Sequence, residues 1–233
     1  MIATLHGASD FVTASADHQD AVFRLVQYST KLLAQLHYRG TARRRELAAI
    51  SSSIDSSRAL TRTFGVLYAL QTFLSAVRGG GSAMRLTLTQ DLALLLYHPL
   101  ETWYWVLHVS GSPKAARRRM LSRLVSALAL AWAMCAGASA ITQARQSAEG
   151  AGSPGGSSTR SELRRHLTKL LLDALLALHW MVDGPGFALR EWQVGLMGTV
   201  SAYLGLRAAY HAHERAASRG LAILGSPLPQ LDD

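Results

Sequence analysis

The sequence predicts an all-α fold, a membrane-associated bundle of about six helices. Apolar residues recur at three- and four-residue spacing along most of the chain, which is typical of helices with one apolar side. Runs of Val, Ile and Thr with period-two alternation, the usual sign of strands, are missing. The chain is 49% hydrophobic and only 17% charged, whereas an average soluble domain carries more charge. These three observations together favour helices that meet lipid.

The charge balance indicates an anionic partner. The chain carries 24 Lys and Arg against 15 Asp and Glu, a formal net charge of +9. Its basic clusters lie at 43–45, 117–119 and 164–165, and such clusters bind acidic lipid, acidic protein or nucleic acid, or are simply solvated helix faces. No recognised nucleic-acid motif accompanies them, and the composition is apolar. We therefore expect a phospholipid membrane, and not nucleic acid, as the partner.

The first predicted helix covers residues 16–38 and is amphipathic. Arg24 and Lys31 lie on its polar side and are predicted to contact lipid headgroups. An amphipathic helix of this kind can lie in a membrane interface with its apolar side buried. The same periodicity also fits a helix packed inside a soluble bundle, so both interpretations stay open here. The predicted membrane-inserting side consists of Val22, Leu25, Val26, Leu32, Leu33 and Leu36.

The second and third predicted helices cover residues 41–77 and 86–109. The second has apolar residues at helical spacing, interrupted by the polar stretch SSSIDSSR. The third contains Pro99 near its middle. Proline lacks the N–H that a helix interior needs, so we expect a kink or a restart there.

The fourth predicted helix begins at Ala115 with several arginines and continues into residues 124–142, which carry no charge. This uncharged stretch is close to the roughly 20 residues that cross a bilayer, and it is a possible span. Residues 147–160 are rich in Gly and Ser and predict a linker. The linker would separate an N-terminal region, 1–146, from a C-terminal helical pair, 161–233.

The fifth and sixth predicted helices cover residues 161–182 and 188–217. Lys169 and Asp173 in the fifth are four apart and could pair. The uncharged stretch 192–206 of the sixth is a second predicted span. Arginines precede the fourth helix and follow the sixth, so two spans would leave both termini in the cytosol. Small residues four apart let helices approach closely, and the predicted helix-packing residues are Gly198, Ser201, Ala202 and Gly205.

The sequence contains no recognisable catalytic motif. A phosphate-binding loop and a Gly-x-Ser-x-Gly nucleophile turn are both missing. His211 and His213 are two apart, which points their rings to different sides of a helix and does not suit one metal ion. We therefore predict a protein that is not an enzyme and uses no cofactor or metal.

Four stretches of the chain, in this order, are similar to those of one known family. They are DAVFRLVQYSTKLL at 20–33; Ser57, Arg58, Arg62 and Phe64 within 47–71; YHPLETWYW at 97–105; and the closing pair LLLDALLALHWMVDGPGF and VGLMGTVSAYLGL. Taken together, they resemble the peroxin-11 family of peroxisomal membrane-elongation proteins. The chain departs from many members at residues 16–20, where ADHQD replaces a more basic start and weakens the expected attraction to anionic lipid.

The resemblance implies an integral protein of the peroxisomal membrane that promotes membrane curvature, elongation and division through its N-terminal amphipathic helix. It also implies self-association and recruitment of the fission machinery, a dynamin-related protein and its adaptor. Two alternatives stay open. One is a membrane channel or carrier for small metabolites, for which Lys169, Asp173 and His179 on an apolar helix are the only support. The other is a soluble all-α adaptor.

Overall fold

A computed structural model describes residues 16–38, 40–79, 84–111, 115–150, 156–182 and 189–224. These residues form seven α-helices and no strand, which confirms the predicted all-α class. The helices are α2 (Ala16–Leu36), α3 (Ala42–Arg62), α4 (Gly65–Gly79), α5 (Met84–Val109), α6 (Ala115–Gly150), α7 (Gly156–Met181) and α8 (Glu191–Leu224).

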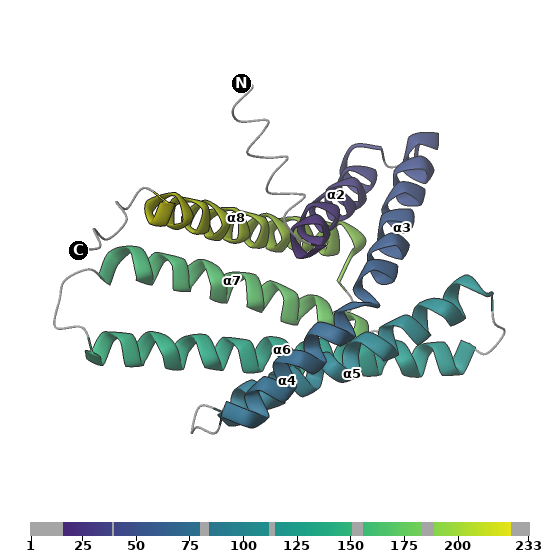
Figure 1. The fold of residues 1–233 in the computed structure, drawn as a ribbon. Helices are drawn as coiled ribbons and strands as arrows, with labels where there is room; N and C mark the ends of the chain where they lie inside the picture. Colours follow the sequence, from purple (N-terminus) through teal and green to yellow (C-terminus); the bar gives the residue numbers. More distant parts are fainter. Residues whose placement is uncertain are drawn as a thin grey trace, which may run out of the picture.

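The helices are arranged around a row of three long ones. Figure 1 shows α6, α7 and α8 side by side, with α2 and α3 near one end of α8 and α7. Helix α5 packs on α6, and α4 packs on α5. Helix α2 contacts both α8 and α3, and α3 in turn contacts α5. The contacts therefore form a closed ring, in which α2 and α3 join the C-terminal helices to the central ones.

The predicted second helix is in fact two helices, so the prediction of one continuous element was wrong. Helix α3 ends at Arg62, Thr63 and Phe64 form a turn, and α4 begins at Gly65. A Cβ at Gly65 would lie 2.8 Å from the ring of His98 on α5. The Thr63 hydroxyl also lies 3.1 Å from that of Thr102. The turn thus redirects the chain where it meets α5.

Helix α5 runs through Pro99 without interruption. The sequence predicted a kink or a restart, because proline removes one backbone hydrogen bond. The chain therefore does not restart at this proline, and α5 packs against both α4 and α6.

Helix α6 is the one described helix that is long and apolar enough to cross a membrane, over Ala115–Gln146. It contains the predicted span 124–142, and only 17% of its most apolar window is buried in the bundle. Helix α8, which contains the predicted span 192–206, does not meet the same measure. Helix α6 continues to Gly150 and α7 begins at Gly156, so helices occupy both ends of the predicted linker. Residues 151–155 lie outside the described part.

The interior of the bundle is built mostly from small residues. One compact apolar cluster consists of Tyr28, Leu176 and Val194, with Leu189 and Met197 packed against it. The other buried apolar residues are mainly alanines, which let helices approach closely: Ala34, Ala59, Ala69, Ala93, Ala133, Ala136, Ala177 and Ala202.

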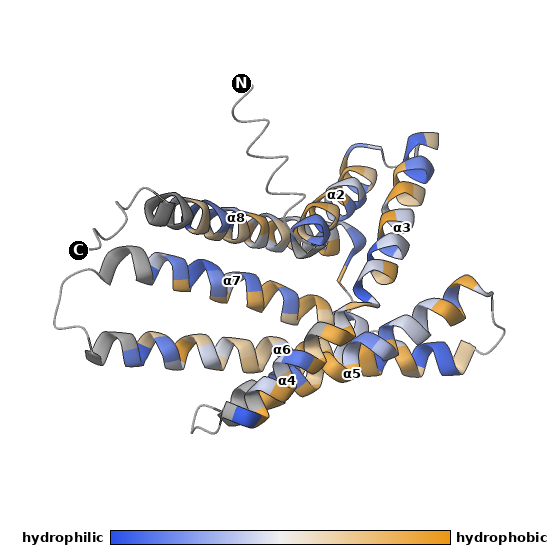
Figure 2. Cartoon of the chain, in the orientation of Figure 1, coloured by the Kyte–Doolittle hydropathy of each residue, from blue (hydrophilic) through white to orange (hydrophobic). Residues whose placement is uncertain are grey.

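Large apolar side chains lie mostly on the outside. Phe64, just before α4, is 71% exposed and Leu67 on α4 is 66% exposed, and Leu70, Leu74 and Val77 continue the same apolar surface. Figure 2 shows hydrophobic residues along α4 and the middle of α6. Extended apolar surfaces of this kind mark sites of membrane or protein interaction.

Candidate membrane interface

Helix α2 turns an apolar face away from the bundle. Phe23, Val26, Leu33 and Leu36 are between 41% and 63% exposed. They belong to the predicted membrane-inserting side, except Phe23, which the sequence prediction omitted. The sequence could have predicted Phe23 as well, because it lies three residues before Val26 and hence on the same face of the helix. We call Phe23, Val26, Leu33 and Leu36 the outer face of α2.

The other three residues of the predicted inserting side are half-buried. They are Val22, Leu25 and Leu32. A Cβ added at Gly195 of α8 would lie 2.9 Å from the backbone N and Cα of Leu32, so the two helices are in close contact at this residue. Part of the predicted apolar stripe is therefore exposed, and the other part packs against the bundle.

Helix α2 runs antiparallel to α8. Tyr28 lies against Gly198, where an added Cβ would fall 2.1 Å from the tyrosine ring, and Gln35 donates to Glu191. The predicted helix-packing residues lie at these contacts and at the contact of α8 with α7. Ser201 is fully buried and Ala202 is 3% exposed. Gly205 faces Lys169 of α7, 2.9 Å from the position its Cβ would take.

Three helices meet at Arg24. Its guanidinium pairs with Asp173 of α7 and donates to the Ser201 hydroxyl of α8 at 3.3 Å. Asp173 also accepts from Lys169 at 2.9 Å and from Ser201. Burial by itself would raise the pKa of Asp173, but Arg24 and Lys169 hold it below its ordinary value. Arg24, predicted at the lipid headgroups, thus points into the bundle in this structure.

A second group of charges joins α2 to α3. Asp20 accepts from Arg58 Nε and Nη2 at 2.8 and 3.0 Å, and Arg62 lies 3.9 Å away. Arg58 is only 5% exposed and also donates to Gln27, whose amide donates to Asp55 at 2.8 Å. Burial would raise the pKa of Asp20, but the two arginines lower it. Asp20 and Gln27, on the polar side of α2, are therefore both bonded to α3.

The charges continue from α3 to α5. Arg62 pairs with Glu101 at 3.0 Å and donates to the Tyr97 hydroxyl at 3.2 Å, and Tyr97 donates to Glu101 at 2.7 Å. Burial raises the pKa of Glu101 in spite of Arg62. We call the whole set the charged network. It comprises Asp20, Arg24, Arg58, Arg62, Glu101, Lys169 and Asp173.

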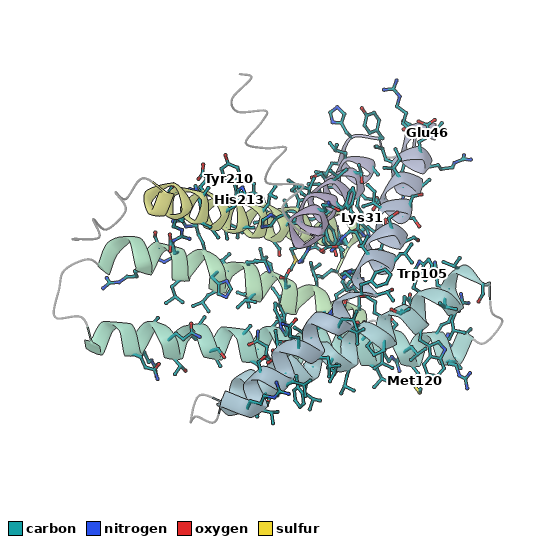
Figure 3. The ribbon with its side chains drawn as sticks, in the orientation of Figure 1. Lys31, Glu46, Trp105, Met120, Tyr210 and His213 are labelled. Carbon is teal, nitrogen blue, oxygen red and sulfur yellow. The ribbon has the colours of Figure 1, made fainter. Side chains whose placement is uncertain are left out.

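The arrangement departs in part from the usual amphipathic pattern. A surface helix of a soluble protein turns its apolar side to the core and its charges to water. Helix α2 directs Asp20, Arg24 and Gln27 inward and its apolar outer face outward. Lys31, also predicted at the headgroups, lies half-buried on α2 (Figure 3). This orientation suits a helix whose outer environment is apolar.

The histidines do not form a metal site in the described part of the chain, where no group of three or more His, Cys, Asp or Glu side chains could hold an ion. His211 Nδ1 instead lies 3.1 Å from Glu214. His179 accepts the backbone N–H of Leu189 at 3.1 Å.

A comparison with models of protein families identifies the family of this chain. The family model described as peroxisomal biogenesis factor 11 (PEX11) matches residues 10–210. The chain belongs to the PEX11 family. This family acts generally in the proliferation and fission of peroxisomes, at the peroxisomal membrane, and is known as a family of biogenesis factors. Comparisons with curated proteins and with solved structures gave no match.

Proposed function

We propose that this PEX11-family protein bends the peroxisomal membrane by inserting the outer face of α2 into the cytosolic leaflet, with α6 as its membrane anchor. An inserted helix adds area to one leaflet only, which favours positive curvature, elongation and then division. The observation that carries the proposal is the orientation of α2, which exposes four large apolar side chains while Asp20 and Arg24 are bonded internally. An integral protein with both termini in the cytosol is part of this proposal, and it requires the chain to cross the membrane a second time after α6, for which residues 192–206 were the predicted span.

The charged network gives the insertion its mechanical support. Arg24 and Asp20 hold α2 against α7, α8 and α3, so the helix enters the interface as part of a rigid bundle. Full burial of a large apolar side chain contributes about 1.5–3 kcal/mol, and roughly half of each outer-face side chain is still exposed. Each of the four therefore contributes about 1 kcal/mol.

The proposal includes self-association and recruitment of the fission machinery, a dynamin-related protein and its adaptor, as the family implies. The exposed apolar residues of α4 and of the turn before it support a further contact surface beyond α2. These residues are Phe64, Leu67, Leu70, Leu74 and Val77.

The experiment is tubulation of anionic liposomes by the full-length protein. Val26→Glu with Leu33→Glu places two charges on the outer face, so we expect intact folding but loss of tubulation. The matched control is Ile50→Glu with Leu60→Glu on α3, where the side chains are 46% and 52% exposed. The control changes charge and apolarity equally and should still tubulate. Tubulation by the α2 variant at the wild-type level would refute the mechanism.

No separate observation favours the alternatives. Lys169 and Asp173, which suggested a channel or carrier, are bonded to each other, and Asp173 is bonded to Arg24 and Ser201 as well. This pairing accounts for their presence on an apolar helix. A soluble adaptor would bury the apolar side of α2, whereas four of its large residues are exposed.

A further inference from the structure

A groove lies between the start of α6 and the end of α7, apart from α2. It has a volume of about 410 Å³ and is open to the outside. One part of its lining is apolar and comes from Met120, Leu124, Ala127 and Met181, and the other carries Arg119 and Arg123. The arginines are four residues apart, so their side chains lie on the same face of α6. The groove therefore combines two cations with an apolar wall.

The groove lies where the candidate span begins. Arg119 and Arg123 immediately precede the uncharged stretch 124–142. On another face of the same helix end, the guanidinium of Arg117 lies over the ring of Trp103 on α5, 5.7 Å from its centre. Arginine and tryptophan are enriched at the level of lipid headgroups. Figure 3 shows Met120 near this end of α6. The groove thus lies at the N-terminal end of the candidate span, where charged and apolar side chains meet.

We propose that this groove binds one anionic phospholipid. Arg119 and Arg123 hold the phosphate through charge-assisted hydrogen bonds. One acyl chain lies along Met120, Leu124, Ala127 and Met181. A small soluble anion would use the arginines only and leave the apolar wall uncovered, whereas a phospholipid matches both parts. The proposal rests on the membrane location of the chain, not on curvature by α2, and the two can fail independently.

The test is photolabelling of the full-length protein in phosphatidylcholine vesicles. One probe is phosphatidic acid with a diazirine on its acyl chain, and the matched probe is phosphatidylcholine with the same chain. We expect phosphatidic acid to label residues 116–127 and Met181 in clear preference to phosphatidylcholine. Arg119→Gln with Arg123→Gln should reduce this labelling by about tenfold, because each arginine near a bilayer surface adds appreciable attraction.

The control is Arg44→Gln with Arg45→Gln, which removes the same charge from exposed positions on α3 and should leave labelling unchanged. Ala127→Leu keeps both arginines and narrows the apolar wall, so labelling of 116–127 should fall while binding to anionic vesicles persists. Equal labelling by both probes, or labelling that survives in the arginine variant or in Ala127→Leu, would overturn the proposal. Displacement of the probe by inorganic phosphate would also overturn it, since it would identify a soluble anion as the ligand.

Discussion

At the scale of single residues, the charges of α2 serve the bundle. Arg24 reaches Asp173 across to α7, and Asp20 reaches Arg58 on α3. The sequence showed that Arg24 lies opposite the apolar stripe but not what it faces. A half-buried charge needs a partner, and that partner lies 149 residues away in the chain. No local pattern can identify a partner at that separation.

Asp173→Asn should destabilise the folded protein by about 2 kcal/mol, because it leaves Arg24 without its countercharge in a half-buried site. The measurement is thermal unfolding in detergent, followed by far-UV circular dichroism. Arg164→Gln, an exposed position on the same helix, is the control and should have little effect. Equal stability of the two variants would show that the ion pair does not hold α2 in place.

The carboxylates of Asp20 and Asp173 predict that the folded protein becomes less stable in acid. The pKa values of Asp20 and Asp173 are lower in the fold than the ordinary 3.8. Both therefore stabilise the fold above that pH, and their contribution is lost as the pH falls below it. Unfolding measured at neutral pH and below 3.8 should show this loss, and Asp20→Asn with Asp173→Asn should lessen it.

Glu101 has the opposite effect on the pH dependence of folding stability. Its pKa is raised above the ordinary 4.5, so ionisation of this group opposes folding and protonation favours it. The wild-type protein should become more stable as the pH falls toward 4.5, because Glu101 takes up a proton. Glu101→Gln should remove this gain. A variant that unfolds with the wild-type pH profile throughout this range would contradict the assignment.

At the scale of helices, glycines set how closely α8 approaches its neighbours. The small-residue spacing of α8 was visible in the sequence, but not the helices it would contact. At Gly195 an added Cβ would meet the backbone of Leu32, which cannot rotate away as a side chain can. At Gly137 of α6 the nearest atom, Leu170 Cδ1, is 3.9 Å away, an ordinary contact.

Gly195→Ala should therefore destabilise the protein by about 1–3 kcal/mol, the usual cost of overpacking, although alanine favours helix. Gly137→Ala, with room for the methyl group, should stabilise it by roughly 0.5–1 kcal/mol. Thermal unfolding of both variants under the same conditions gives the comparison. A stabilising Gly195→Ala would mean that α2 and α8 do not pack this tightly.

At the scale of the whole molecule, many large apolar side chains are exposed, while the interior consists mostly of alanines together with a few buried polar groups such as Arg58 and Ser201. Met134 on α6 is 65% exposed although it lies within the uncharged stretch 124–142. Such a surface is stable where its surroundings are lipid. The proposed anchor therefore depends on the outer side of α6 more than on its contacts with α5 and α7.

Met134→Arg should release the protein from membranes on alkaline carbonate extraction, because an arginine near the bilayer centre costs about 2.5–3.5 kcal/mol on insertion scales. Met120→Arg, 56% exposed at the start of the same helix, is the control and should remain in the pellet. Retention of both variants would argue against α6 as a span, and release of wild type would argue for a soluble protein.

The sequence by itself determined the helical class, the apolar stripe of α2, the uncharged segment of α6 and the family. These follow from local periodicity and composition, which neighbouring residues impose on each other. Only the tertiary structure decided which side of each helix faces outward, that residues 41–77 form two helices, and that Arg24, Arg58 and Arg62 are internal. The physical reason is that an ion pair or a glycine contact forms between residues far apart in the chain, whose meeting depends on the packing of all the helices.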